Sequence, residues 1–254
     1  MRKLAIAALL ALMTSPAAAQ GNIELNVRTP GVVYNSGLLD LAKAYTKETG
    51  IKVTVKSEGM SRIVSDVKTG TPIADVFSVP VAFMDGMEAE HSVLAGTAAE
   101  LGRVYIGLAV RKGQPHPSDI STPAKLAAAL KAGGTVIYSN PANGSMEARI
   151  INDMLHRNAV FHGVKSQISI KGEGGQALIK GQGDMALQLI CEVLNHPELE
   201  LVGIVPPELG AYIDSKLAVS VRSPHPEAAK AFVAYLLKPE HAALWKSKGL
   251  ERTK

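Results

Sequence analysis

The sequence predicts an α/β fold of two lobes, each a mostly parallel sheet flanked by helices. Short β-branched runs such as 51–55 alternate with amphipathic segments such as 38–49, and Gly50 and Gly70 each follow a helical segment. A glycine just past a helix readily adopts the left-handed conformation that ends many helices. Strand, helix and strand in this order need crossover connections, which are typical of parallel sheets covered by helices.

The expected elements form two α/β series in tandem. We expect strands at 23–27, 51–55, 75–79, 103–110, 135–138, 167–170, 184–190, 199–205 and 216–221. We expect helices at 38–49, 62–69, 122–130, 146–157, 176–180, 226–237 and 239–247, and another that begins at Pro80. The final elements return to the first series, so residues 20–101 with 204–254 are expected to form lobe 1 and residues 102–203 lobe 2. Crossings near 101–105 and 198–205 would leave a cleft lined by the carboxyl ends of strands.

Residues 1–19 have the pattern of a secretory signal peptide. Met1-Arg2-Lys3 is a basic start, residues 4–13 are an apolar run, and three alanines at 17–19 precede Gln20. This pattern predicts cleavage after Ala19 and export to the periplasm. No later run approaches about 20 apolar residues, so the mature chain is not expected to span a membrane. Cys191 is the only cysteine, which excludes an internal disulfide.

Charge and aromatic content argue against a nucleic-acid-binding protein. The chain has 27 Lys and Arg against 23 Asp and Glu, and only 4% of its residues are aromatic. Nucleic-acid binders usually carry a basic stripe and rings that stack on bases. The seven histidines are scattered, and no GxSxG, P-loop or HExxH motif occurs, so neither a metal nor a cofactor is expected. We expect a monomer that binds a small molecule.

The stretch 135–149, TVIYSNPANGSMEAR, indicates where that molecule binds. An apolar strand is followed by a small polar loop, and Ser145 can cap the helix that comes next. The first backbone N–H groups of a helix lack internal partners and lie at the positive end of its dipole, so an anion is favoured there. Three further loops, 28–37, 57–62 and 172–176, have the same small, polar character. Four such loops at strand ends predict one shared anion site.

Several segments follow the pattern of one family. They are GMSRIVSDVKTGTPIADVFSV at 59–79, YSNPANGSMEARI at 138–150, GQGDMALQL at 181–189 and the paired C-terminal helices. With these segments the mature chain resembles periplasmic solute-binding proteins of the molybdate-binding type, the capture components of ABC importers. The resemblance implies the two-lobed periplasmic binding protein fold, a small anion held in the interlobe cleft, and an ABC permease as partner.

The resemblance also implies a set of ligand-binding residues, because this family holds its oxyanion with hydroxyls and backbone N–H groups. Carried over by position, these are Thr29, Gly31, Gly59, Ser61, Asn143, Gly144, Ser145 and Gly174. Two positions depart from the family: Thr29-Pro30-Gly31 stands where a serine is common, and Leu189, with Gln188 beside it, stands where a tyrosine is common. The ligand therefore stays open between a tetrahedral oxyanion and an organic polyanion.

Arginines beside these loops favour a carboxylate ligand. Arg28, Arg62 and Arg149 flank three of the four loops. A planar guanidinium pairs with a carboxylate through two hydrogen bonds, so two or three of them around one cleft suit a di- or tricarboxylate. The alternative is that Arg62 and Arg149 lie in exposed first turns and make weak surface ion pairs, and that Arg28 only ends its strand.

An enzymatic alternative comes from a second resemblance, to aconitate isomerases of the same branch of the fold. Such an enzyme moves a double bond by a proton shift beside a carboxylate, and one side chain carries the proton. Glu58 and Glu173 are the candidate catalytic residues, because each lies among small residues in one of the four loops. The alternative for both is a solvated loop glutamate.

Overall fold

Ten strands join in one mixed sheet in the computed structural model, which describes residues 23–253. The strands are β1 Glu24–Thr29, β2 Lys52–Ser57, β3 Val76–Pro80, β4 Ala99–Arg111, β5 Val136–Tyr138, β6 Ser166–Ile168, β7 Met185–Leu189, β8 Leu199–Ile204, β9 Tyr212–Val219 and β10 Leu250–Glu251. Their order is β2-β1-β3-β9-β4-β7-β5-β6, and β8 and β10 also pair with β4.

Helices cover both faces of this sheet. The α-helices are α1 Gly31–Val33, α2 Leu39–Thr49, α3 Met60–Thr69, α4 Val81–Ala89, α5 Pro123–Ala132, α6 Met146–Arg157, α7 Gly174–Ile179, α8 Ile190–Val193, α9 Pro226–Leu236 and α10 Ala242–Ser247. A π-helical turn, η1 Tyr34–Leu38, joins α1 to α2. Short 3₁₀ turns are η2 Pro141–Asn143, η3 Ala159–Phe161, η4 Pro207–Leu209 and η5 Pro239–His241.

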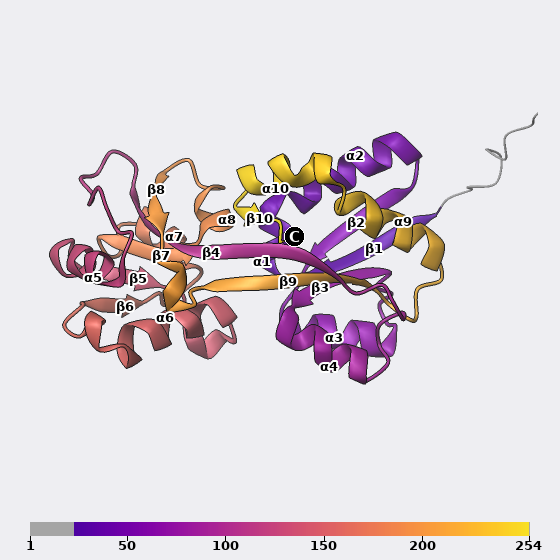
Figure 1. The fold of residues 1–254 in the computed structure, drawn as a ribbon, viewed down its shortest axis with the longest axis horizontal. Helices are drawn as coiled ribbons and strands as arrows, with labels where there is room; N and C mark the ends of the chain where they lie inside the picture. The colour runs from indigo at the N-terminus through magenta and orange to yellow at the C-terminus, as the bar shows by residue number, and fades with distance from the viewer. Residues whose placement is uncertain (1–22, 254) are drawn as a thin grey trace, which may run out of the picture.

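The elements gather into two groups joined by β4 and β9, which run side by side (Figure 1). The first group holds β1–β3, α1–α4, α9 and α10, and the second holds β5–β8 and α5–α8. Parallel pairs lie within each group, where β1 pairs with β2 and β3, and β5 pairs with β6 and β7. The two joining strands pair antiparallel with their neighbours. The α/β prediction is confirmed, and the antiparallel pairs arise where the chain passes between groups.

The main hydrophobic core extends through both groups. Leu25 of β1, Leu108 of β4, Tyr138 of β5 and Trp245 of α10 are all buried within it. A second cluster, which includes Ile63 and Phe77, lies under α3 and α4. At roughly 25 cal/mol per Å² of apolar surface buried, these cores supply most of the drive to fold. They also fix the strand ends from which the loops emerge.

Local signals in the sequence place several helix ends correctly. Gly50 and Gly70 adopt φ of 75° and 69° and end α2 and α3, as predicted. The loop expected at 28–37 is instead helical, because α1 and η1 continue directly into α2. Gly37 permits this kinked junction, since its φ of 107° is a conformation that other residues rarely adopt. The predicted signal peptide lies outside the described residues.

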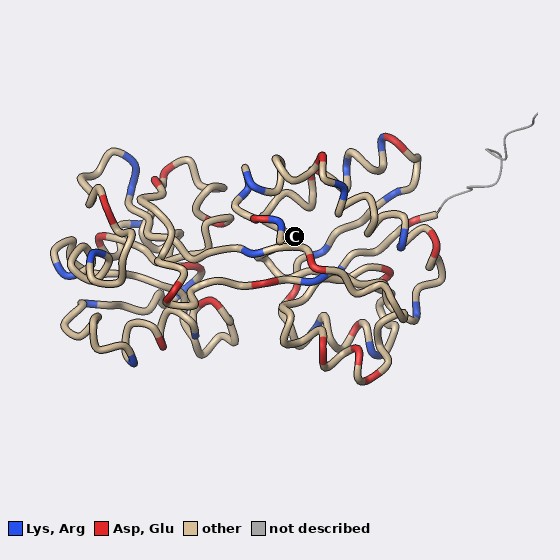
Figure 2. Tube along the Cα trace, viewed as in Figure 1, with Lys and Arg blue, Asp and Glu red and all other residues tan. Residues whose placement is uncertain are grey.

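Charged residues of both signs are spread over both groups (Figure 2). Some form exposed pairs such as Lys52–Glu24 and Lys230–Glu227, which stabilise a fold only weakly. Every helix in residues 23–253 is too short or too polar to cross a bilayer.

Candidate functional site

A cavity of about 480 Å³ is lined by residues of both groups. The first group contributes the residues after β1 and β2, and the second contributes the loop after β5, the start of α6 and the end of β7. Ser61 and Ser145, 84 positions apart in the sequence, both line it. The strand-end loops therefore meet at one cavity, as expected for ligand sites at the carboxyl ends of strands.

The first group supplies an uncapped helix start. Gly59 is the residue before α3 and is extended, and no side chain caps this end of the helix. The Arg62 N–H donates to the Gly59 carbonyl at 3.0 Å. The N–H groups of Met60 and Ser61 have no partner within the helix and lie at the positive end of its dipole. Gly31, Gly59, Ser61 and Arg62 all line the cavity beside this helix start.

The second group supplies the start of α6. Ser145 precedes this helix, and its Oγ accepts a hydrogen bond from the Ala148 backbone N–H at 3.2 Å. Asn143, Gly144 and Ser145 line the cavity. Because Ser145 already caps the helix, its hydroxyl hydrogen is what it has left to donate to a ligand.

Five of the residues predicted for the site lie away from the cavity lining. Thr29 is buried, and its Oγ1 lies 2.6 Å from Ser78 Oγ. Arg149 is exposed on α6, and Glu173 is the residue before α7. Gly174 packs against Tyr138 of β5. Gln188 is buried and donates a hydrogen bond to Glu192, which does line the cavity.

Two glutamates that the sequence analysis did not single out line the cavity. Glu147, in the first turn of α6, is 5% exposed, and Glu192, in α8, is 7% exposed. Gln188 Nε2 donates a hydrogen bond to Glu192 Oε2, and Gln188 Oε1 accepts one from the Gly175 N–H at 3.2 Å. Glu192 is thus held in place by Gln188, which is itself held by the backbone at the start of α7.

Burial changes the acidity of these glutamates. Loss of solvent, with Glu173 nearby, raises the pKa of Glu192 to about 8, although the Gln188 hydrogen bond opposes this. Burial and the neighbouring Glu192 and Glu173 raise the pKa of Glu147 well above its usual range. Burial also raises the pKa of Glu173. A carboxyl group with a pKa of about 8, as in Glu192, holds a proton at neutral pH and can donate a hydrogen bond.

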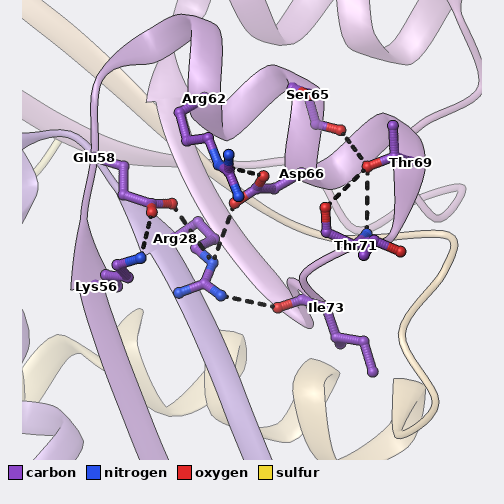
Figure 3. Close-up of polar contacts among 9 residues, drawn as sticks. All are labelled: Arg28, Lys56, Glu58, Arg62, Ser65, Asp66, Thr69, Thr71 and Ile73. Atoms are coloured by element: carbon purple, nitrogen blue, oxygen red, sulfur yellow. Dashed lines mark hydrogen bonds and ion pairs between the residues drawn. The ribbon is translucent and has the colours of Figure 1, made fainter.

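Glu58 also lines the cavity, but its carboxylate lies beside two cations, Lys56 and Arg28 (Figure 3). Its carboxylate lies 2.8 Å from Lys56 Nζ and 3.6 Å from Arg28 Nε. The hydrogen bond from Lys56 is the largest cause that lowers the pKa of Glu58, and the charge of Arg28 adds to it. Glu58 is therefore an ionised carboxylate held by two cations.

Arg28 and Arg62 are both engaged with Asp66 of α3 (Figure 3). Arg28 is buried between Glu58 and Asp66, and its Nη2 donates to the Ile73 carbonyl at 3.5 Å. Arg62 reaches Asp66 at 2.7 Å from an exposed position on the cavity wall. Arg62 is thus the arginine that a ligand in the cavity can reach.

Apolar side chains complete the wall. Met60, Met146, Leu189 and Ile213 line the cavity between the two helix starts. The site therefore combines polar groups at helix ends with an apolar surface, which is the usual make-up of a small-molecule pocket.

Comparison with known proteins decides the family. Residues 34–251 match the model of a family described as bacterial extracellular solute-binding protein. The chain belongs to this family. The resemblance to solute-binding proteins predicted from the sequence is therefore confirmed.

Known relatives of this solute-binding protein include an enzyme and two anion-binding proteins. The aconitate isomerase of a Pseudomonas species is 28% identical over 253 residues, covering 98% of this chain and 95% of the isomerase. The periplasmic molybdate-binding protein of Azotobacter vinelandii superposes with a TM-score of 0.69 at 15% identity, covering 91% and 100% of the two chains. The sulfate-binding protein SubI of Mycobacterium tuberculosis superposes with a TM-score of 0.68 at 18% identity, covering 92% and 88%. The structural matches establish the shared fold.

Proposed function

We propose that this solute-binding protein captures a small organic polyanion, such as a di- or tricarboxylate, in the cavity between its two groups of elements. The observation that carries the proposal is the lining of that cavity. Two helix starts and Arg62 supply donors for anionic oxygens, while Met60 and Leu189 supply an apolar wall for a carbon skeleton. A tetrahedral oxyanion has no carbon to place on that wall and is much smaller than about 480 Å³.

The proposal includes the setting in which the protein works. The chain would be exported with its first 19 residues removed, bind its ligand in the periplasm as a monomer and deliver it to an ABC permease. The two groups of elements would act as lobes, divided at 101–102 and 203–204, that close on the ligand. A closed form is favoured only by the extra contacts that the ligand makes in it.

Calorimetric titration of the purified protein tests this function. We expect heat and a single site with citrate, trans-aconitate or tricarballylate, and much weaker binding of molybdate, tungstate and sulfate. Arg62→Met should weaken carboxylate binding about tenfold or more, because a charge-assisted pair in the cavity is lost. Arg149→Met is the matched control, since Arg149 lies outside the cavity lining. Absence of heat with every anion would exclude the proposal.

A second candidate function is an isomerase that shifts the double bond of a bound tricarboxylate. Two observations favour it: the match to an aconitate isomerase over 98% of this chain, and a buried carboxyl group on the cavity wall. In an allylic shift, a base removes a proton from a methylene carbon, the double bond moves by one position, and a proton returns to the far carbon. No atom is gained or lost overall.

Glu192 suits this proton transfer better than Glu58 or Glu173. An ideal proton carrier has a pKa near the working pH, and the pKa of Glu192 is about 8. Glu58 is held ionised by its cations, and Glu173 lies outside the cavity lining. An ultraviolet assay with trans-aconitate tests the reaction: a change in absorbance that Glu192→Gln abolishes supports the isomerase. Binding of trans-aconitate without any change over hours leaves a receptor alone.

A further inference from the structure

We infer that Glu147 and Glu192 form a proton-holding carboxyl pair in the cavity, so that the protein binds its anion only while the pair is protonated. This inference rests on the proposed anion-binding function and adds to it a dependence of affinity on proton concentration. It also assigns a binding role to two residues that neither the sequence pattern nor the resemblance indicates.

Burial without a counterion is the first observation. Glu147 and Glu192 are 5% and 7% exposed, and no ion pair within residues 23–253 includes either of them. A buried carboxylate without a cation is costly, so such a group takes up a proton instead. The two residues face the same cavity, where the charge of Glu192 raises the pKa of Glu147 and the charge of Glu173 raises the pKa of both.

An unpartnered oxygen is the second observation. Glu147 Oε1 is buried and has no hydrogen-bond partner within the described part of the chain. The backbone N–H of Leu189 interacts with the carboxyl group of Glu147. A buried polar atom without a partner destabilises the empty protein, so a cavity-lining residue that keeps such an atom is suited to bind a ligand. In its protonated form Glu147 can donate a hydrogen bond to an anionic oxygen of that ligand.

Glu192 presents its carboxyl group in a fixed orientation. Gln188 holds Oε2, while Oε1 is the atom nearest to the position that a side chain on Gly31 would occupy, at 3.7 Å. Gly31 lines the cavity from the opposite group. The pair therefore lies where the two groups approach each other, and a ligand there contacts both.

Charged residues on the elements packed around the pair have partners of their own. The elements that pack on α8 and α6 include β4, β7, β8, β9 and η1. Their ionised side chains are engaged as follows: Arg111 with the carbonyls of Leu178 and Gly183, Arg103 with Asp214, Glu200 with His116, and Lys216 with Asp85. Glu173 acts on both members of the pair and has His196 beside it, while burial and the pair itself raise the pKa of Cys191. The other charged residues on the cavity wall are Glu58 and Arg62. Within residues 23–253, neither carboxyl group of the pair is in ion-pair contact with a cation.

The expected pH dependence follows from the sign of these shifts. The pKa of Glu192 is about 8 without ligand, so the pair is neutral at pH 7 and loses a proton above pH 8. The new negative charge repels an anion and removes a donor. If one proton is involved, affinity falls about tenfold between pH 7 and pH 9. Tricarboxylates are fully ionised over this range, so the ligand adds no slope of its own.

Titration of the full chain with trans-aconitate and with tricarballylate, which has no double bond to move, tests the inference. We expect the Kd to rise about tenfold from pH 7 to pH 9. Heats measured at pH 8 in HEPES and in Tris should differ, because their ionisation enthalpies differ, and should show uptake of about half a proton or more for each ligand bound. This measurement uses the unmodified protein, so it does not depend on the folding of a variant.

Variants separate the pair from other titrating groups. Glu192→Gln should reduce the change in Kd between pH 7 and pH 9 to less than about twofold, because the amide does not titrate. Glu88→Gln, on the exposed side of α4, should keep the tenfold change. Binding with the same Kd at both pH values and no proton uptake would overturn the inference and leave the anion-binding function standing. Absence of binding by both tricarboxylates at every pH would overturn both.

Discussion

Buried charged residues fall into two kinds in this protein. Arg28 and Asp66 are buried in ion-pair contact, and the Glu58 side chain, 9% exposed, also contacts Arg28. Glu147 and Glu192 are buried without a cation among the described residues. Burial of a charge is costly in both cases, and only the first kind recovers part of that cost through pairing. The two kinds therefore respond in opposite ways to pH and to mutation.

The first prediction concerns the effect of pH on Glu192. Its pKa is raised from 4.5 to about 8 on folding, so the folded state holds the proton over a range where the unfolded state has lost it. The free energy of unfolding should therefore fall as pH rises from about 4.5 to about 8, by up to about 1.4 kcal/mol per pH unit for one proton. Urea unfolding of the ligand-free protein at pH 5, 6.5 and 8 measures this slope.

Glu192→Gln isolates that contribution. The amide does not titrate, so the variant should not lose stability between pH 5 and pH 8 as the wild type does. The free energy of unfolding of the variant minus that of the wild type should therefore be larger at pH 8 than at pH 5. Glu88→Gln provides the baseline for an exposed glutamate. Equal slopes in the wild type and Glu192→Gln would show that Glu192 does not hold a proton on folding.

The second prediction concerns the two arginines at Asp66. Arg28→Met should lower the free energy of unfolding by about 3 kcal/mol, because Glu58 and Asp66 would keep buried charges with one cation fewer. Arg62→Met should cost less than about 1 kcal/mol, since the Arg62 side chain is 58% exposed. Thermal or urea unfolding of both variants measures the contrast. Similar losses would mean that burial does not distinguish the two arginines.

Elements with local signals were predictable from sequence, and those made by distant contacts were not. Ser145 and Thr122 cap α6 and α5 where the sequence analysis placed helix starts. In contrast, no helix was expected directly after the strand at 184–190, where Cys191 and Glu192 belong to α8, a short helix that packs against β4, β8 and η1. Its sequence is too short to show helical periodicity, so only the tertiary contacts define it. Glu192 was missed as a wall residue for this reason.

The candidate site was partly predictable for the same reason. The pattern of small residues after strands indicated the loops, and the family resemblance implied Gly31, Gly59, Ser61 and Ser145 within them, all of which line the cavity. Glu147 was read only as a residue in the first turn of a helix, because nothing local shows that its side chain faces a cavity. The pairing of β4 with β7 and β9, between residues about 80 to 110 positions apart, sets where these loops meet.

The third prediction concerns the packing of α7 on β5. A side chain on Gly174 would place its Cβ 2.7 Å from Tyr138 Cα, which is backbone and cannot turn away. Gly174→Ala should therefore cost at least about 1–3 kcal/mol of stability, as overpacking does. Gly86→Ala, in α4 where nothing lies within 4 Å of the new methyl group, should be stabilising by about 0.5–1 kcal/mol. Equal effects in urea unfolding would contradict the close approach of α7 to β5.

At the scale of the whole molecule, β4 and β9 are the connection on which any relative motion of the two groups depends. Arg103 of β4 and Asp214 of β9 form a two-point ion pair, with Nε–Oδ1 at 2.7 Å and Nη2–Oδ2 at 2.8 Å. The Arg103 guanidinium also lies 3.5 Å from the centre of the Tyr212 ring. These contacts tie the two strands to each other.

The fourth prediction is that ligand binding brings the two groups together. Cys191 is buried, so spin labels can be placed on introduced cysteines without reaction at the native thiol. Glu88→Cys on α4 and Arg157→Cys on α6 report on opposite groups from exposed positions. The distance between these labels should shorten, and its distribution should narrow, when a saturating tricarboxylate is added, because the ligand contacts both walls of the cavity.

A second pair of labels within one group provides the control. Glu88→Cys and Glu227→Cys, on α4 and α9, both lie in the first group, so their distance should not change with ligand. A constant distance for both pairs, with tight binding of the same tricarboxylate, would show that the cavity binds its ligand without closure. Changes of equal size in both pairs would show that the two groups do not move as separate bodies, and the proposed division into lobes would then be wrong.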